Sequence, residues 1–312
     1  MWRSTNSVNG GPQKTVPSAN GNGNGVAVKH SETLDVLRPV GSGERGLSPR
    51  KSSLVLIPAH NEGMNLPQVL ERVHAVLPGV DVLVIDDGSH DDTFKVAAEH
   101  GAIVARHPFN LGVGAALQTG YRYALEHGYE RLVQLDADGQ HRPEDVIRLL
   151  EILRADEADM AVGCRFLKGS GPYPMPWLRR MGRDYQCTII KMLTGRRFAD
   201  PTSGLRAMNR HVLALFAQDV FPADYPDADV LVMLCKAGVR IKEAPATMRL
   251  REFGVSQHDG PKVVYYLFRM TLSLLVIALG RGFKPLARLE KRDIPELVAE
   301  PQPVGVAKRA VQ

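Results

Sequence analysis

From Ser53 onward, short runs of β-branched and other apolar residues alternate with longer stretches of helical periodicity, and this alternation limits the possible folds more than any other feature. Strands are expected at 54–57, 82–85, 103–105, 131–135 and 160–163, with one more inside 239–249. Helices are expected at 66–77, 92–100, 112–127, 143–153, 177–193 and 228–237. Strands that alternate with helices of this length form βαβ units. We therefore predict an α/β fold with a Rossmann-like, mostly parallel central sheet flanked by helices.

The two ends of the chain differ in composition from this body. Residues 1–50 are rich in Gly, Asn and Ser and contain no apolar run of signal-peptide length, so we predict a disordered tail there and a flexible tail over 286–312. Residues 1–51 carry seven basic and three acidic side chains, and residues 280–312 carry seven and four. Residues 52–279 hold 25 basic and 27 acidic groups, so the formal charge of +5 belongs to the ends. This distribution argues against a nucleic-acid partner.

The apolar segment 263–279 raises the question of a membrane. It is shorter than the roughly 20 residues of a spanning helix, it contains Arg269, and Lys262 and Arg281 flank it. Two interpretations stay open: an amphipathic helix over 261–285 that lies on the membrane surface, or a buried C-terminal core helix. Three cysteines without a CxxC pair fit a reducing compartment. We predict a cytoplasmic protein, with peripheral contact to the cytoplasmic face of a membrane left open.

Polar segments follow each of the first four expected strands, where ligands bind in parallel sheets. They are Pro58–Glu62, Asp86–Ser89, Arg106–Gly112 and Asp136–Gln140. The oxygens of Asp136, Asp138 and Gln140 suit Mg²⁺ or Mn²⁺. A capping or turn role is the alternative for such an Asp-x-Asp, but its position after an apolar strand favours a metal site.

Three further segments offer places for a nucleotide or a phosphate. Asp86-Asp87-Gly88-Ser89 is either a plain turn or a hydrogen-bond acceptor for a base or ribose. Residues 112–116 open a helix with small residues, which lets an anion approach the backbone. Neither a Walker loop nor a GxGxxG fingerprint is present. Residues 200–206 combine hydroxyls with an arginine, as a phosphate-binding loop or a plain loop would.

Taken together and in this order, these motifs resemble the family 2 glycosyltransferases with a GT-A fold. The motifs are Pro58–Glu62, Asp86–Ser89, Asn110–Ala115, Asp136–Gln140 and Thr202–Arg206. The most similar members are the dolichyl- and polyprenyl-phosphate mannosyl- and glucosyltransferases, and the resemblance covers about residues 52–260. It implies a GT-A domain at 51–260 and an inverting, Mg²⁺- or Mn²⁺-dependent transfer of a hexose. The donor would be a nucleoside-diphosphate sugar of the UDP-glucose or GDP-mannose type, and the acceptor a polyprenyl phosphate of cell-envelope glycan synthesis.

The resemblance also implies roles for individual residues. The nucleotide-sugar site would comprise Pro58, Ala59, Glu62, Asp86, Asp87, Gly114, Ala115 and Asp136. Asp136, Asp138 and Gln140 would hold the metal, and Arg165 would face the reaction centre. The acceptor and its phosphate would meet Ser203, Arg206, Arg249 and Arg251. Asp229 is the candidate general base, which is required only if the acceptor is a hydroxyl.

Several alternatives remain beside this interpretation. The acceptor could be a soluble or other lipid hydroxyl, or the chain could bind nucleotide sugars without catalysis. A sugar-nucleotide pyrophosphorylase is disfavoured, because no Gly-rich loop with a basic residue follows the first strand. Lipid-linked members often continue into transmembrane helices, whereas here only 263–279 is apolar. The sequence leaves the sugar, the base and the oligomeric state open.

Overall fold

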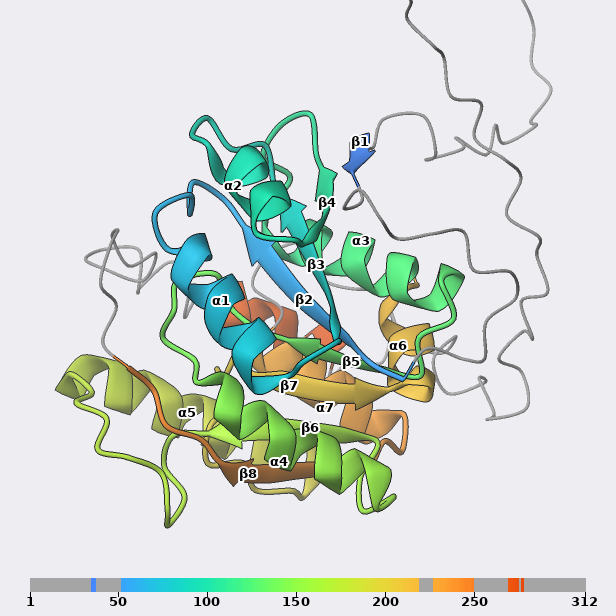
Figure 1. Cartoon of the computed structure of the whole chain (residues 1–312). Coiled ribbons are helices and arrows are strands. Elements are labelled where there is room, and N and C mark those ends of the chain that lie inside the picture. The colour runs from blue at the N-terminus through green and yellow to red at the C-terminus, as the bar shows by residue number, and fades with distance from the viewer. Residues whose placement is uncertain (1–34, 38–51, 219–226, 250–268, 275, 278–312) are drawn as a thin grey trace, which may run out of the picture. The chain divides into compact units, whose positions relative to one another are not determined.

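A computed structural model describes residues 35–37, 52–218, 227–249, 269–274 and 276–277 of the chain (Figure 1). These residues form one eight-stranded sheet in the order β1-β4-β3-β2-β5-β7-β6-β8. The strands are β1 Asp35–Leu37, β2 Leu54–Ala59, β3 Asp81–Asp86, β4 Ile103–Arg106, β5 Arg131–Gln134, β6 Met160–Cys164, β7 Arg206–Asn209 and β8 Ile241–Pro245. Strands β2 to β5 pair in parallel, as do β6 and β8, while β7 is antiparallel to β5 and β6 and β1 to β4. The predicted mostly parallel α/β sheet is confirmed.

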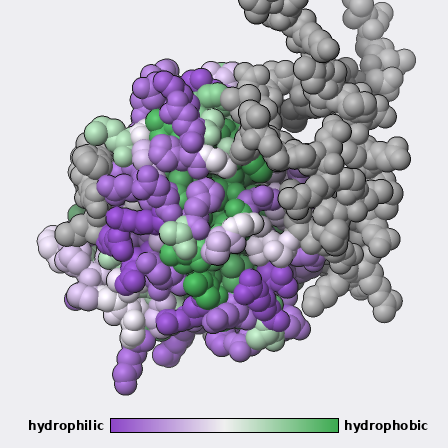
Figure 2. All heavy atoms as spheres, viewed as in Figure 1, coloured by the Kyte–Doolittle hydropathy of each residue, from purple (hydrophilic) through white to green (hydrophobic). Residues whose placement is uncertain are grey.

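Helices cover both faces of the sheet (Figure 1). They are α1 Leu66–Val76, α2 Thr93–Glu99, α3 Val113–Glu126, α4 Pro143–Arg154, α5 Trp177–Thr194, α6 Arg210–Phe216 and α7 Ala228–Lys236. Side chains alternate along β2, so that Val55 and Ile57 pack with α1 and α4, while Leu54 and Leu56 pack with α3, α6 and α7. Figure 2 shows hydrophobic residues at the centre of one face with hydrophilic residues around them. Burial on both faces is what a parallel sheet requires.

Strand β2 marks the point where the strand order reverses. The chain passes from β2 through α1 to β3 on one side, whereas β5 pairs with the other side of β2. In open α/β sheets the ligand crevice lies beyond the carboxyl ends of the strands at this switch point. The topology therefore places the segments after β2 and β5 at the crevice.

Three elements lie outside the expectations from the sequence. Strand β1 falls within the stretch 1–50 that was predicted to be disordered, and it pairs with β4 at three positions. Strand β7 continues the 200–206 motif and leads directly into α6, where the side chain of Asn209 accepts a hydrogen bond from Val212 N at 3.1 Å. The other residues of the two predicted tails lie outside the described residues.

Residues 269–274, 276 and 277 are helical and belong to the segment considered for the membrane. Met270, Leu274 and Ile277 are buried against the core cluster that contains α3 and α7, while Leu272 and Val276 are exposed. This is the packing of a core helix, and the rest of 261–285 lies outside the described residues. No helix among the residues described is both long and apolar enough to cross a membrane.

Candidate active site

The loop after β5 carries the first acidic residue of the predicted metal site. Leu135 N donates to Leu56 O at 2.9 Å and ties the loop to β2. The side chain of Asp136 is 38% exposed, and its Oδ2 accepts from the buried His141 Nε2 at 2.9 Å. Burial disfavours the charge of Asp136, but the hydrogen bond and charge of His141 keep the pKa of this carboxyl below its ordinary value. Gly204 lies against the same carboxylate, and a Cβ there would overlap it.

The second part of this loop is fixed by a neighbouring segment. Asp138 Oδ1 accepts from Gln140 N at 3.0 Å, and Gln140 Nε2 donates to Arg249 O at 3.2 Å. Arg249 N donates in return to Gln140 O at 2.7 Å, and His141 forms an antiparallel bridge with Met248. The loop thus brings two carboxylates and one amide together beside the exposed Arg249. Arg251 lies outside the described residues.

At the end of β3, Asp87 organises the loop before α3. Its Oδ1 accepts from His107 Nδ1 at 2.7 Å and from Leu111 N at 2.9 Å, and its Oδ2 accepts from Gly112 N at 2.9 Å. Burial disfavours the carboxylate, but the hydrogen bonds from His107, Leu111 and Gly112 lower its pKa below the ordinary value. The buried carboxylate therefore fixes the N-terminus of α3, where Gly114 is buried and Ala115 half-buried.

The neighbouring residues at this edge of the sheet also form hydrogen bonds and an ion pair. Asp86 is buried and forms an ion pair with Arg106 Nε at 3.1 Å, while its Oδ1 accepts from Ser89 N at 2.9 Å. Asp87 N donates to Ala59 O at 2.8 Å, which joins the end of β2 to this turn. Pro58 and Ala59 thus lie beside the Asp86–Ser89 turn, as the register of β2 and β3 requires.

Glu62 continues the loop after β2. Its backbone N donates to Thr93 Oγ1 at 2.9 Å, and its Oε2 accepts from Asn65 Nδ2 at 2.5 Å. These contacts tie the loop to the starts of α2 and α1. The sequence-predicted nucleotide residues therefore gather in the loops after β2 and β3 and at the first turn of α3.

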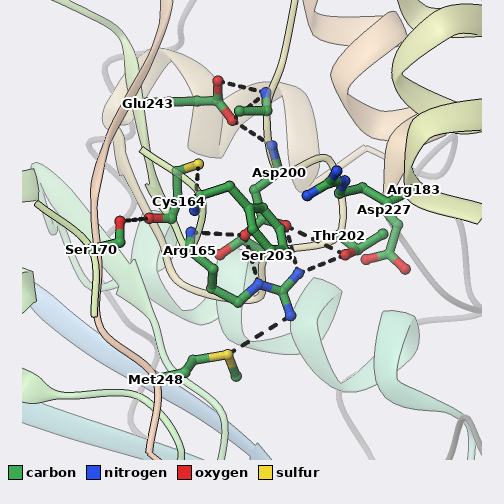
Figure 3. Close-up of polar contacts among 12 residues, drawn as sticks. Cys164, Arg165, Ser170, Arg183, Asp200, Thr202, Ser203, Asp227, Glu243 and Met248 are labelled. Carbon is green, nitrogen blue, oxygen red and sulfur yellow. Dashed lines mark hydrogen bonds and ion pairs between the residues drawn. The ribbon is translucent and has the colours of Figure 1, made fainter. Parts of the chain in front are cut away.

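The Arg165 cluster follows β6 and consists of Arg165, Asp200 and Thr202, which Figure 3 labels, and the rings of Tyr173 and Phe166 beneath the guanidinium. Arg165 Nε and Nη2 donate to the two oxygens of Asp200 at 2.6 and 2.5 Å, and its backbone N donates at 3.0 Å. Nη2 also reaches Thr202 Oγ1 at 2.7 Å, and the guanidinium carbon lies 5.0 Å from the ring centroid of Tyr173. Burial disfavours the charge, but Asp200 raises the pKa of Arg165 further above its ordinary value. The cation is therefore permanent and rigidly oriented.

Glu243 on β8 supports this cluster from behind. Its carboxylate accepts from Ala199 N at 2.9 and 3.0 Å and from Asp200 N at 2.8 Å, as Figure 3 shows. Burial and the charge of Asp200 raise the pKa of Glu243, although these backbone hydrogen bonds act in the opposite direction. Strand β8 thus fixes the position of Asp200 through Glu243, and Asp200 fixes Arg165.

The 203–206 segment turns inward. Ser203 and Arg206 are each 2% exposed. Arg206 Nε donates to Ser203 O at 2.9 Å, and Nη2 lies 3.7 Å from Asp227 Oδ1. These contacts place the guanidinium inside the protein, where it shapes the loop around Gly204.

Asp229, the candidate base, lies in the first turn of α7 and is 3% exposed. Its Oδ1 accepts from Val230 N at 2.8 Å and Asp227 N at 3.1 Å, and its Oδ2 accepts from Ser273 Oγ at 2.9 Å. Burial is the main reason that the pKa of Asp229 rises to about 6. The structure thus seals this carboxyl beneath the helical residues 269–274.

Residues 54–216 match the family model described as Glycosyl transferase family 2. The chain belongs to this family. It is 35% identical over 245 residues to the polyprenol monophosphomannose synthase of Mycolicibacterium smegmatis, covering 75% of this chain and 91% of the relative. It is 34% identical over 214 residues to the undecaprenyl-phosphate mannosyltransferase of Micrococcus luteus, covering 66% and 87%. As a family 2 member, the protein is a glycosyltransferase enzyme.

Solved structures agree with the fold. Glucosyl-3-phosphoglycerate synthase from Mycobacterium tuberculosis, in complex with Mn²⁺ and UDP-glucose, has a TM-score of 0.55 and 21% identity, covering 74% of this chain and 79% of that chain. The same enzyme with phosphoglyceric acid has a TM-score of 0.56 and 20% identity. At these identities the likeness shows the GT-A fold, as predicted for this glycosyltransferase.

Sequence reasoning missed several residues that organise the site of this glycosyltransferase. His107 and His141 hold Asp87 and Asp136, and Asp200 and Glu243 hold Arg165. His141 stands five residues after Asp136, so its proximity was a usable signal. The other contacts join residues 20 or more positions apart and leave no local pattern.

Proposed function

We propose that the protein transfers a hexose, with inversion, from a nucleoside-diphosphate sugar to a polyprenyl phosphate. The observation that carries this proposal is the pairing of two unlike sites along one edge of the sheet. The loop at 136–140 offers carboxylate and amide oxygens, and the Arg165 cluster offers a fixed cation. The names of the relatives support an acceptor of this class, since both act on a polyprenyl-type phosphate.

The acidic loop suits the donor. Asp136, Asp138 and Gln140 are hard oxygen donors, each only half-buried, so they are open to a divalent cation. In the part of the chain that is described, no three His, Cys, Asp or Glu side chains gather in a way that could hold a metal. The protein would therefore supply part of a Mg²⁺ or Mn²⁺ shell and leave the rest to diphosphate oxygens, as magnesium sites commonly do. The metal would stabilise the charge on the leaving diphosphate.

The nucleoside would occupy the neighbouring loops. Pro58, Ala59 and Glu62 lie after β2, and Asp86 and Asp87 follow β3. Because Asp87 is used to fix the start of α3, its part in nucleoside binding would be to hold Gly114 and Ala115 in place.

The basic groups suit the acceptor. Arg165 would orient the acceptor phosphate, and the exposed Arg249 beside Gln140 would neutralise charge on either phosphate group. Arg206 and Ser203 contribute by shaping the loop at Gly204, since both are buried. Arg251 keeps its proposed role in phosphate binding on the resemblance alone.

The state of Asp229 favours a phosphate acceptor over a hydroxyl. A hydroxyl needs a general base within reach of its proton. Asp229 is 3% exposed and its Oδ2 accepts a hydrogen bond from Ser273 Oγ, so it is out of reach of a hydroxyl acceptor that arrives from solvent. A phosphate monoester, with a second pKa of about 6, is already ionised near neutral pH and can attack the anomeric carbon without help. The place of action would be the cytoplasmic face of a membrane that carries such lipids.

The test is a transfer assay with labelled UDP-glucose and GDP-mannose, polyprenyl phosphate, and Mg²⁺ or Mn²⁺. We expect one donor to label the lipid fraction, with Asp138→Ala inactive. Glu126→Gln, an exposed substitution at the far end of α3, is the matched control and should retain full activity. If the correctly folded protein transferred sugar from neither donor, the proposal would be contradicted.

A further inference from the structure

The loop after β2 turns sharply at Asn61. Its φ is +56°, in the left-handed region that residues with a Cβ seldom adopt, and among the described residues other than glycine only Asp156 shares this feature. Asn tolerates the region better than most residues, but the conformation still needs contacts to hold it. One contact comes from the turn after β3, where Ser89 Oγ accepts from Asn61 N at 2.9 Å. The turn after β3 therefore helps to hold a strained residue next to Glu62.

Three further hydrogen bonds run through this loop in one direction and form the His60 network. His90 N donates to Asn61 Oδ1 at 2.9 Å, and Asn61 Nδ2 donates to His60 Nε2 at 3.1 Å. His60 Nδ1 then donates to Asp87 O at 2.9 Å. A backbone N–H can only donate and a backbone carbonyl can only accept, so the two ends of the network fix the amide of Asn61 and the tautomer of His60. The ring carries its proton on Nδ1, accepts at Nε2, and is neutral.

A second proton on His60 does not fit this network. It would place an N–H at Nε2 against the NH2 of Asn61, so that two donors face each other. Turning the amide of Asn61 over would only move the mismatch to His90 N, where the NH2 would then meet a backbone N–H. The His60 network is therefore complete only while His60 is neutral, and histidine gains its charge between about pH 8 and pH 5.

The histidine on the other side of Asp87 has different partners. His107 Nδ1 donates to Asp87 Oδ1 at 2.7 Å, and its Nε2 lies 3.0 Å from Thr119 Oγ1. A hydroxyl can accept as well as donate, and a carboxylate attracts a charged ring, so both contacts of His107 persist in either protonation state. Of these two histidines, only His60 has partners that exclude its charged form.

Other titratable groups lie on the segments around the network. They are Glu62 on the same loop, Asp87, His90 and Asp91 after β3, His107 after β4, and the ion-paired Asp86 and Arg106. Burial disfavours the charge of Asp87 and Asp91, but the hydrogen bonds that each accepts hold the pKa of both carboxyls below the ordinary value. Both are therefore ionised between pH 5.5 and pH 8. His90 enters the network through its backbone alone, so the imidazole of His60 is the one network group of a type that titrates in this range.

We propose that His60 is a positioning residue of the nucleotide-sugar site. In its neutral form it joins the left-handed turn at Asn61 to the backbone of Asp87, and so holds the loops after β2 and β3 in one arrangement. This inference rests on the proposed function, which places the nucleoside of the donor against these two loops. Protonation of His60 should release the turn and weaken the binding of the nucleotide sugar.

The first test measures donor binding against pH. UDP-glucose and GDP-mannose are titrated calorimetrically into the full-length protein with saturating Mg²⁺ at pH 8.0 and pH 5.5. The dissociation constant of whichever donor binds should be about tenfold higher at pH 5.5, because a histidine with the ordinary pKa of about 6.5 is then about nine-tenths protonated. Both phosphates of these donors are diesters, which do not titrate in this range.

Two variants show whether His60 causes this effect. His60→Gln keeps one donor and one acceptor but cannot be charged, so it should bind within about threefold of the wild type at pH 8.0 and lose the fall in affinity at pH 5.5. His127→Gln, at the C-cap of α3, removes a histidine that is bonded to Tyr123 O and should keep the wild-type fall. A fall of equal size in His60→Gln and in the wild type would overturn the proposal.

A third variant should reverse the pH dependence. Asn61→Asp replaces the NH2 that faces His60 with a carboxylate oxygen, which accepts from the charged ring, while the other oxygen still accepts from His90 N. Asp also tolerates the left-handed region. The affinity for the donor should therefore be at least about threefold higher at pH 5.5 than at pH 8.0. Equal weakening at both pH values, or the fall seen in the wild type, would contradict the proposal.

The tautomer of His60 can be observed without any donor. In full-length protein labelled with ¹⁵N-histidine, the NMR signals of His60 are assigned by their loss in His60→Gln. They should show a proton on Nδ1 and none on Nε2 at pH 8.0, and a proton on Nε2 would overturn the proposal. Wild-type protein that binds neither donor at pH 8.0 would refute the proposed function and the role of His60 together. Donor binding that is unaffected by pH would refute this inference alone.

Discussion

Asp136 and Asp229 are the same residue type in two regions with opposite environments. Asp136 follows β5 at the open edge of the sheet, is partly exposed, and has its pKa held down by His141 against the effect of burial. Asp229 lies under a helix, is almost fully buried, and has its pKa raised to about 6 chiefly by that burial. The difference teaches that the first region keeps a negative charge beside solvent, whereas burial in the second region disfavours the charge of the carboxyl.

The largest effect is expected at the acidic loop. Asp138→Ala removes a proposed metal ligand from the loop after β5, and the rate of sugar transfer should fall about a thousandfold. The loop backbone is held independently by the pairing of Gln140 with Arg249, so the melting temperature should change little. Initial rates and thermal melts check this, with Asp138→Glu as the conservative variant. Transfer within tenfold of the wild type would show that Asp138 does not act on the donor.

The next effect concerns Asp200, which holds the Arg165 guanidinium in place. Asp200→Asn breaks a buried, bidentate pair, and we expect about 3 kcal/mol of lost stability together with a roughly hundredfold lower transfer rate. KM for the acceptor should rise while the affinity for the nucleotide changes little. Chemical denaturation and steady-state kinetics measure the two effects. A matched loss of affinity for both substrates would point to collapse of the whole edge instead of a mispositioned Arg165.

A smaller effect is expected from Gly204→Ala. The added Cβ would overlap the Asp136 carboxylate and displace it, without removing any functional group. We expect transfer to fall about tenfold and the concentration of Mn²⁺ needed for half-maximal rate to rise. A metal titration of the rate checks this. An unchanged Mn²⁺ concentration for half-maximal rate would show that Asp136 does not hold the metal.

The smallest effect on transfer is expected at Asp229. With a polyprenyl phosphate acceptor, Asp229→Asn should keep the rate within about threefold, because an ionised phosphate needs no base. The pH dependence of the free energy of unfolding should change instead. The folded pKa lies above the ordinary value of 3.8, so the favourable contribution of the protonated carboxyl is present below pH 4 and is lost as the pH rises through about 6. The wild type should therefore lose about 2–3 kcal/mol of this contribution between pH 4 and pH 7.

The asparagine variant lacks this titration and should show a flatter stability profile over the same pH range. Denaturation of both proteins at pH 4.5, 6 and 7.5 measures the difference. Parallel profiles would mean that Asp229 is ionised in the folded protein, as a working base would be.

The comparison also shows which parts of the molecule were predictable. Strand β5 and the carboxylates that follow it could be predicted, because an apolar run and an Asp-x-Asp are both local patterns. The short β7 and α6 were missed, since β7, with the sequence Arg-Ala-Met-Asn, has no run of β-branched residues and takes its place in the sheet by pairing with β5 and β6. The burial of Asp229 depends on Ser273, 44 residues away, and the partner of Arg165 stands 35 residues away. Tertiary contacts of this kind leave no periodic signal in the sequence.

The central claim is that the acceptor is a lipid phosphate which attacks without a protein base. The most direct measurement compares sugar transfer to polyprenyl phosphate with transfer to the matching polyprenol, for the wild type and for Asp229→Asn. The account predicts labelled lipid from polyprenyl phosphate alone, at similar rates in both proteins. Transfer to the polyprenol that Asp229→Asn abolishes would contradict it and would assign Asp229 the role of general base.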